Sequence, residues 1–221
     1  MLKVGNKPII EHILEKIESV NEVEEVLVVT NARFYDHFRV WLNDYTFSKK
    51  IKIINDGTIS NDDRLGAVGD INFVLKEEEI KSDLLVIAGD NLFGFELNKL
   101  IGQYKDNNKS IVAFRDLKDV NKVKGKFGVG ILEASKIIDF EEKPLVPKSS
   151  LAATACYLFT KEDLKHVEKS IEQGKADNPG DLVKHLVKES EIHGFVFDEH
   201  WYDVGSFESL KEAEGVYKNE N

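Results

Sequence analysis

Two aspartates, Asp90 and Asp203, stand in contexts that suit phosphate chemistry. Asp90 follows the apolar run 84–88, so it lies where a buried strand would end, the usual place for ligand chemistry in open α/β sheets. Asp203 lies in the segment 201–205, beside a tryptophan and a tyrosine. Two such carboxylates could share one divalent metal ion on a nucleotide phosphate.

Each aspartate also has an ordinary interpretation. Asp90 stands in a Gly-Asp-Asn run, and these residue types favour simple turns. Asp203 could cap a helix over 206–217, and the neighbouring Trp201 and Tyr202 could be core residues. Neither aspartate alone therefore establishes a site.

The segment Glu142-Lys143-Pro144 is more specific. The proline ring restricts the preceding residue, so we expect Lys143 to be extended and its neighbours to point to opposite sides. A carboxylate such as Glu142 suits sugar or ribose hydroxyls, and an ammonium suits a phosphate. The alternative is a solvated acidic turn, because Asp139 and Glu141 are close by.

Two glycines, Gly66 and Gly69, fall inside a stretch, 64–78, whose apolar spacing predicts a helix. Glycine inside a helix costs about 1 kcal/mol relative to alanine, so something approaches that backbone closely. A nucleobase or sugar is one candidate, and tight packing of helix on sheet is the other. The chain contains neither a G-x-G-x-x-G fingerprint nor a Walker loop.

Composition narrows the function classes. The chain has 221 residues, of which 42% are hydrophobic and 32% charged, with a net charge of −10. Such an acidic chain is not expected to bind nucleic acid, and no apolar run approaches the length of a membrane span. The single cysteine, Cys156, excludes an internal disulfide, and its apolar surroundings favour a buried small hydrophobe. A cytoplasmic location is the expectation.

The order of predicted elements indicates one α/β domain over residues 1–221. Strands alternate with helices through the first half, which is typical of a mainly parallel sheet covered on both faces. A hairpin predicted over 127–140 then interrupts this alternation of strands and helices. Further strands are predicted over 152–159 and 192–196, and the last helix over 207–217.

Taken together, six segments resemble the sugar-1-phosphate nucleotidyltransferases, the family of glucose-1-phosphate thymidylyltransferases and uridylyltransferases. Their order and spacing, over nearly the whole chain, carry the resemblance. The segments are Val4-Gly5-Asn6-Lys7-Pro8-Ile9-Ile10-Glu11, Leu65-Gly66-Ala67-Val68-Gly69-Asp70, Ala88-Gly89-Asp90-Asn91, Phe127-Gly128-Val129, Phe140-Glu141-Glu142-Lys143-Pro144 and Trp201-Tyr202-Asp203-Val204-Gly205.

The resemblance implies a three-layer α/β/α Rossmann-like fold with a mixed, mainly parallel sheet. It also implies a reaction in which a sugar-1-phosphate attacks the α-phosphorus of a nucleoside triphosphate, forming an NDP-sugar and pyrophosphate. Asp90 and Asp203 would hold Mg²⁺, and Lys143 would hold the sugar phosphate. The implied substrate contacts are Gly66 at the base, Gly128 and Glu142 at the sugar, and Gly89 and Thr154 beside them.

Two departures from the family qualify this expectation. Family members open with a strand and a glycine-rich loop that binds the triphosphate, and Met1 falls after the matching point. We therefore expect an N-terminally shortened chain with weak or no turnover, and exposed apolar surface that a homo-oligomer could cover. Ala153 and Ala155 stand where the family usually has Asn and Gly, which puts glucose specificity in doubt.

Two rival functions are also considered. A metal-dependent glycosyltransferase of related fold usually carries D-x-D at the strand end, whereas Asp90 is followed by Asn91 and Leu92. A non-catalytic sugar-nucleotide-binding or regulatory protein would share the fold. Such a protein would not need the glycine-rich loop that binds the triphosphate in the family. Binding without turnover would favour this second rival.

Overall fold

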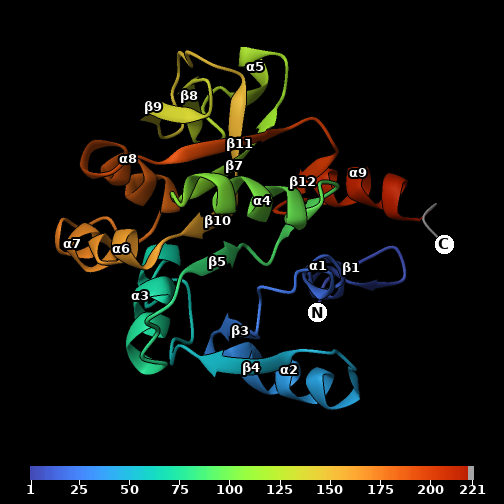
Figure 1. Cartoon of the computed structure of the whole chain (residues 1–221). Coiled ribbons are helices and arrows are strands. Elements are labelled where there is room, and N and C mark those ends of the chain that lie inside the picture. The colour runs from blue at the N-terminus through green and yellow to red at the C-terminus, as the bar shows by residue number, and fades with distance from the viewer. Residues whose placement is uncertain (219–221) are drawn as a thin grey trace.

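The computed structural model describes residues 1–218, in which the largest sheet is mixed and has six strands (Figure 1). The strands are β1 Lys3–Val4, β2 Lys7–Pro8, β3 Glu25–Thr30, β4 Lys50–Asn55, β5 Leu84–Ile87, β6 Asn91–Phe93, β7 Ile111–Asp116, β8 Val129–Glu133, β9 Lys136–Glu141, β10 Leu151–Phe159, β11 His193–Phe197 and β12 Trp201–Asp203. The helices are α1 Ile9–Glu18, α2 Ala32–Asp44, α3 Ala67–Glu77, α4 Leu97–Asn107, α5 Val120–Val123, α6 Lys161–Leu164, α7 His166–Glu172, α8 Pro179–Glu189 and α9 Phe207–Tyr217.

Side-chain alternation along the strands divides the core into two layers. On β7, Ile111 and Ala113 face a cluster that includes the apolar sides of α1 and α4. Val112 and Phe114 face the opposite cluster, formed with α3, α7 and α8. The sheet is therefore covered on both faces, which makes the three-layer α/β/α arrangement that the sequence predicted. No helix among residues 1–218 is long and apolar enough to cross a membrane.

The six-stranded sheet has the order β5-β10-β7-β11-β9-β8 and is mixed, as predicted. Its strands run mainly in one direction, which β5, β7, β11 and β8 share, although within this sheet only β7 and β11 pair directly in parallel. The reason is that β10 enters between β5 and β7 in the reverse direction. The predicted hairpin is confirmed as β8 and β9, which turn at Ala134 with a φ of 52°.

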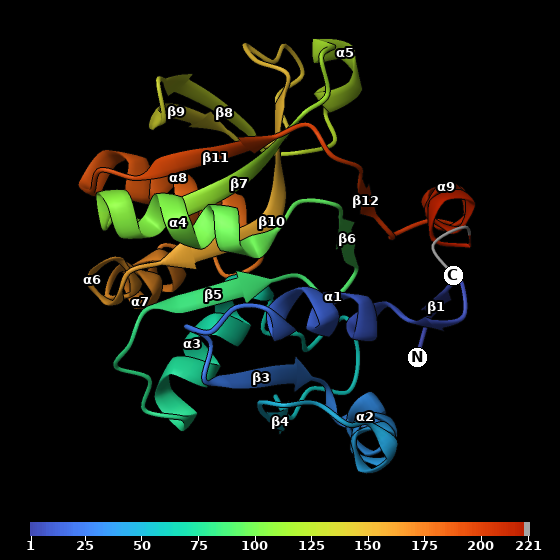
Figure 2. The same cartoon turned by 45° about the vertical axis from the view of Figure 1, so that its right-hand side comes forward.

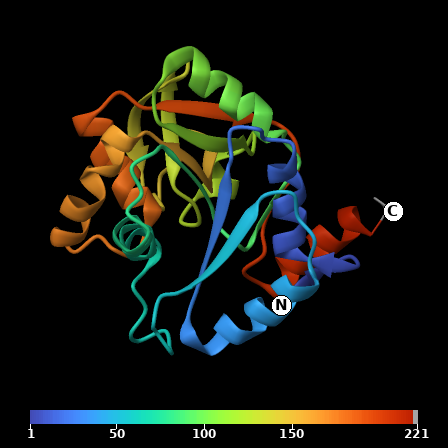
Figure 3. The same cartoon turned by 60° about the horizontal axis from the view of Figure 1, so that its bottom comes forward.

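Strands β3 and β4 form a separate parallel pair that lies below β5 in Figures 1 and 2, and Figure 3 shows it from beneath. In Figure 2 the arrows of β3 and β5 point the same way. Among the described strands, β3 pairs only with β4, and β5 pairs only with β10. Both strands are apolar, yet no residue of either is fully buried. Each therefore presents an open edge of backbone donors and acceptors.

Local sequence explains where several elements begin. Pro179 opens α8, where a missing backbone N–H costs nothing. Ser206 and Ser209 form a reciprocal capping box at the start of α9. The short strands β6 and β12 pair with each other beyond the end of β5, and this pairing positions both aspartates of the candidate site.

Candidate active site

The loop that follows β5 carries Asp90 and is held by a chain of hydrogen bonds. The Ala88 N–H donates to the Ala155 carbonyl at 3.0 Å, and the Asn91 N–H donates to the Ala88 carbonyl at 3.2 Å. The buried Asn91 side chain donates from Nδ2 to Asp90 Oδ1 at 2.8 Å. Its Oδ1 accepts a 2.6 Å hydrogen bond from Trp201 Nε1. The Asn91 amide thus orients the Asp90 carboxylate, and the Trp201 indole on β12 holds that amide in place.

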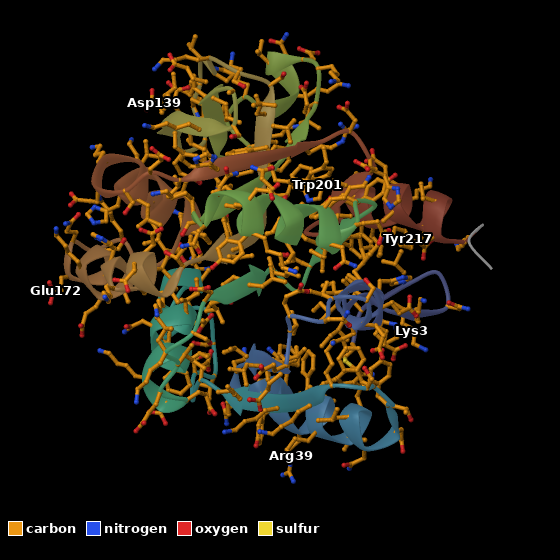
Figure 4. All side chains as sticks on the ribbon, viewed as in Figure 1. Lys3, Arg39, Asp139, Glu172, Trp201 and Tyr217 are labelled. Atoms are coloured by element: carbon orange, nitrogen blue, oxygen red, sulfur yellow. The ribbon has the colours of Figure 1, made fainter. Side chains whose placement is uncertain are left out.

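Trp201 is the anchor on β12. Figure 4 shows it near the middle of the molecule beside β12, whereas labelled surface residues such as Asp139 lie at the periphery. Its ring also packs edge-on against Phe127, with 4.9 Å between ring centroids. The interpretation of Trp201 as a core residue therefore holds only in part, because its N–H serves the Asp90 loop.

Asp203 lies beside Asp90. It pairs with Asn91 across the β6–β12 ladder, and the Val204 N–H donates to the Asp90 carbonyl at 2.9 Å. Partial desolvation raises the pKa of the Asp203 carboxyl, and the negative charge of Asp90 raises it further. The Lys143 ammonium offsets part of that increase. The helix-cap interpretation of Asp203 is wrong, because Ser206 caps α9.

Lys143 does not have the extended backbone that Pro144 led us to expect. Its φ is +44°, in the left-handed region that non-glycine residues seldom occupy. This turn at the end of β9 brings the exposed ammonium into range of the Asp203 and Glu142 charges. Strain of about 1 kcal/mol or more is retained at this position.

Glu142 occupies a confined place next to Lys143. Burial raises the pKa of its carboxyl, Lys143 lowers it, Asp181 raises it and Lys184 lowers it. No hydrogen bond or ion pair to Glu142 occurs within residues 1–218. By contrast, Asp139 and Glu141 both pair with Lys148. The three acids of this turn therefore differ in their partners. Of the three, Glu142 is the one whose carboxylate oxygens are unpaired among the described residues and can accept a hydrogen bond from a ligand hydroxyl.

Gly128 borders the same place. A side-chain carbon there would come within 2.5 Å of the Phe140 ring and 3.0 Å of Glu142 Oε2. Its carbonyl accepts the Ala153 N–H at 2.8 Å, which ties the start of β8 to β10. Gly89 is exposed next to Asp90 and has open space where a side chain would project. Both glycines therefore lie beside the acidic residues.

Gly66 has a structural reason to be glycine. It precedes α3 with a φ of +78°, so the predicted helix over 64–78 begins only at Ala67. A side chain at Gly66 would come within 2.6 Å of the Ala176 carbonyl oxygen and of Asp177. Carbonyls of these two residues also accept the first backbone N–H groups of α3. Close packing accounts for Gly66 without a nucleobase, but its partner is the segment before α8 and not the sheet that the sequence suggested.

Thr154 does not present its hydroxyl to a ligand. The residue is 1% exposed, and its Oγ1 donates to the Ala113 carbonyl inside the sheet at 3.0 Å. The expectation of a substrate contact is therefore wrong for this side chain. Its neighbour Ala155 has a φ of +52°, within an irregularity where β10 shifts register against β7. Cys156 is buried, and burial raises the pKa of its thiol to about 12.

Two carboxylates are available for a metal ion. Within residues 1–218 no three His, Cys, Asp or Glu side chains form a metal-binding group. Asp90 and Asp203 nevertheless repel each other, since the charge of one raises the pKa of the other. Mg²⁺ usually takes one or two carboxylates together with phosphate oxygens and water. The pair therefore fits Mg²⁺ that arrives with a nucleotide.

Asn91 and Trp201 were not predicted as parts of the site, although both stand in segments that carry the family resemblance. The hydrogen bond between them depends on the pairing of β6 with β12, which the sequence does not show.

Comparison with known proteins identifies the family. A sequence model described as "Nucleotidyl transferase" matches residues 1–220. The chain belongs to the nucleotidyl transferase family. Bifunctional protein GlmU of Methanocaldococcus jannaschii is 30% identical over 217 residues, which are 96% of this chain and 47% of that protein. GlmU of Methanococcus aeolicus is 29% identical over 216 residues, again 96% of this chain and 47% of that protein.

The chain thus spans about half the length of these curated relatives. Solved structures agree on the fold. A putative glucose-1-phosphate thymidylyltransferase from Bacillus anthracis, in complex with sucrose, has a TM-score of 0.82 at 21% identity, covering 100% of this chain and 86% of that one. A UDP-glucose pyrophosphorylase bound to UDP-glucose has a TM-score of 0.80 at 21% identity, covering 100% and 90%. At this identity the likeness establishes a nucleotidyltransferase α/β fold.

Proposed function

We propose that this nucleotidyl transferase joins a nucleoside monophosphate from a nucleoside triphosphate to a sugar-1-phosphate, releasing pyrophosphate. The observation that carries the proposal is the convergence of Asp90, Asp203 and Lys143 beside the unpaired Glu142 carboxylate. Two acids, one ammonium and one free carboxylate match a divalent metal, a phosphate and sugar hydroxyls. The solved structures that share this fold include one whose name specifies a sugar-1-phosphate and one whose name specifies a sugar nucleotide.

The chemistry requires little proton transfer from the protein. The attacking oxygen belongs to a phosphate that is already an anion, so no general base is needed. Alignment and neutralisation of charge supply most of the rate. Lys143 would hold the sugar phosphate in line with the α-phosphorus, and its strained backbone fixes where the ammonium can reach. Glu142 would accept hydrogen bonds from sugar hydroxyls.

Mg²⁺ is proposed as the cofactor, held by Asp90 and Asp203. When bound, the ion would neutralise charge on the transferred phosphoryl group and the departing pyrophosphate. The protein's own part is to keep the two carboxylates adjacent, through the β6–β12 ladder and the Asn91–Trp201 hydrogen bond. Cation binding would also relieve the repulsion between the two carboxylates.

The test is a pyrophosphate-release assay with Mg²⁺, five nucleoside triphosphates and a panel of sugar-1-phosphates. Turnover that disappears in Asp90→Asn and Asp203→Asn variants supports the proposal. Unchanged turnover in both variants refutes the assigned metal pair. The matched control is Asp62→Asn, which removes an exposed aspartate on the loop before α3.

The same assay tests the prediction of weak turnover by residues 1–221 alone. A comparison sample carries the glycine-rich strand and loop of a family member, fused before Met1. A large gain in turnover on fusion supports the prediction, and equal turnover contradicts it. If neither sample turns over but calorimetry detects UDP-glucose binding, the non-catalytic binding function replaces the transferase.

A further inference from the structure

A second glycine, Gly180, also borders the Glu142 carboxylate. A side-chain carbon at Gly180 would lie 1.8 Å from Glu142 Oε2 and 2.8 Å from its carboxyl carbon. The carboxylate therefore occupies the space that any side chain at position 180 would fill. Gly128 approaches the same oxygen to 3.0 Å by the same measure. The Glu142 carboxylate thus lies against two backbone segments, one just before β8 and one at the start of α8.

Backbone geometry does not explain why position 180 is glycine. Its φ lies outside the left-handed region, so an L-residue fits the backbone there. Gly180 follows Pro179 in the first turn of α8, where alanine would favour the helix by up to about 1 kcal/mol. The helix thus carries a small loss of stability at this residue. What the glycine permits is the close approach of the Glu142 carboxylate.

We propose that Gly180 is a positioning residue that sets where the Glu142 carboxylate meets the sugar hydroxyls. The proposal rests on the transferase function proposed above. Since no protein hydrogen bond holds Glu142 within residues 1–218, packing is what fixes its place. A flexible side chain confined only by packing moves readily when the space is filled. An added methyl at position 180 should therefore displace Glu142 rather than unfold α8.

The kinetic test compares Gly180→Ala with Gly102→Ala. Gly102 lies in α4 with nothing within 4 Å of an added side-chain carbon, so it controls for placing alanine in a helix. Gly180→Ala should raise KM for the sugar-1-phosphate about 10- to 100-fold, the range for losing a hydrogen bond to a charged group. KM for the nucleoside triphosphate should stay unchanged, and Gly102→Ala should change neither.

A shorter acid provides the rescue. Glu142→Asp withdraws the carboxylate by one methylene, so it avoids the methyl of Gly180→Ala. The double variant should therefore lose less than the product of the two single losses. Strictly multiplicative losses would overturn the proposal, because they would show that the two positions act independently.

Carbon-13 NMR of the labelled Glu142 carboxyl gives a readout that needs no turnover. Burial keeps the pKa of this carboxyl raised, so displacement into solvent in Gly180→Ala should lower it toward its ordinary value. An unchanged titration in a folded Gly180→Ala protein refutes the positioning role. Absence of turnover in the unaltered protein, both as residues 1–221 and with the fused strand and loop, would refute the transferase function, while the titration still decides the role of Gly180. If Gly180→Ala fails to fold, Gly180→Ala with Glu142→Ala must fold, or steric conflict with Glu142 is not the cause.

Discussion

Replacing Asp70 by asparagine should stabilise the protein, with a gain that depends on pH. Asp70 lies in the first turn of α3, and its Oδ1 is buried with no hydrogen-bond partner among the described residues. Burial raises the pKa of this carboxyl from 3.8 to about 6, and the charge of Asp56 adds to the increase. Asparagine keeps the shape and removes the charge.

The sign follows from the raised pKa. A carboxyl that is harder to ionise in the folded state costs no stability below its unfolded pKa, and its cost grows as pH rises toward the folded pKa. With values of 3.8 and about 6, the cost is about 1 kcal/mol at pH 4.5 and about 2 kcal/mol at pH 5.5. It levels off at about 3 kcal/mol near pH 7. Asp70→Asn should recover most of this energy.

Urea unfolding of both proteins at several values between pH 4.5 and pH 8 measures the difference directly. The gain in the free energy of unfolding of Asp70→Asn should rise up to about pH 7 and remain level above it. Asp62→Asn, on an exposed loop, serves as the control and should show no such rise. A gain that is the same at every pH, or a loss, would refute the assignment of a buried, unpaired charge to Asp70.

Three other predictions concern the candidate site. Ala155→Gly should relax a backbone with φ of +52°, so we expect Tm to rise by about 2–4 °C; a fall would contradict strain there. Trp201→Phe leaves the Asn91 Oδ1 without its donor, so the free energy of unfolding should fall by about 1–3 kcal/mol and kcat should drop. Unchanged denaturation and turnover would remove Trp201 from the site. Asp203→Asn should lower kcat at least about 100-fold at saturating Mg²⁺, without lowering Tm, because it also removes repulsion with Asp90. A lower Tm would show that the charge pair stabilises the fold.

The long elements follow from the sequence because their apolar spacing reports burial directly. The strand that begins at Leu84 and the helix that begins at Phe207 both fall within predicted ranges. The helix after Gly66 was predicted to begin too early, because carbonyls of a distant loop satisfy its first N–H groups. Strands of two or three residues, such as β6 and β12, are too short for any period to appear.

The site was predictable only as a set of residue types. Asp90, Asp203 and Glu142 stood out because acids after strands suggest ligands, and the structure brings the first two together. The backbone of Lys143 was not predictable, because left-handed geometry before a proline contradicts local preference. Thr154 was misassigned because its hydroxyl donates to the Ala113 carbonyl inside the sheet, and that partner depends on a strand pairing that the sequence does not show.

Edge-to-edge pairing between copies of this chain would use the open edges of β3 and β5. Joining β3 of one copy to β5 of the next is a heterologous contact, which leaves one free edge of each kind and so propagates unless a ring closes. Joining β5 to β5 about a two-fold axis ends after a single contact. The net charge of −10 repels copies in both arrangements and does not distinguish them. A lysine or proline on β3 would block the β3–β5 contact and leave the β5–β5 contact, so it separates a fibre-forming sample from a particle of finite size, whereas the same change on β5 would block both.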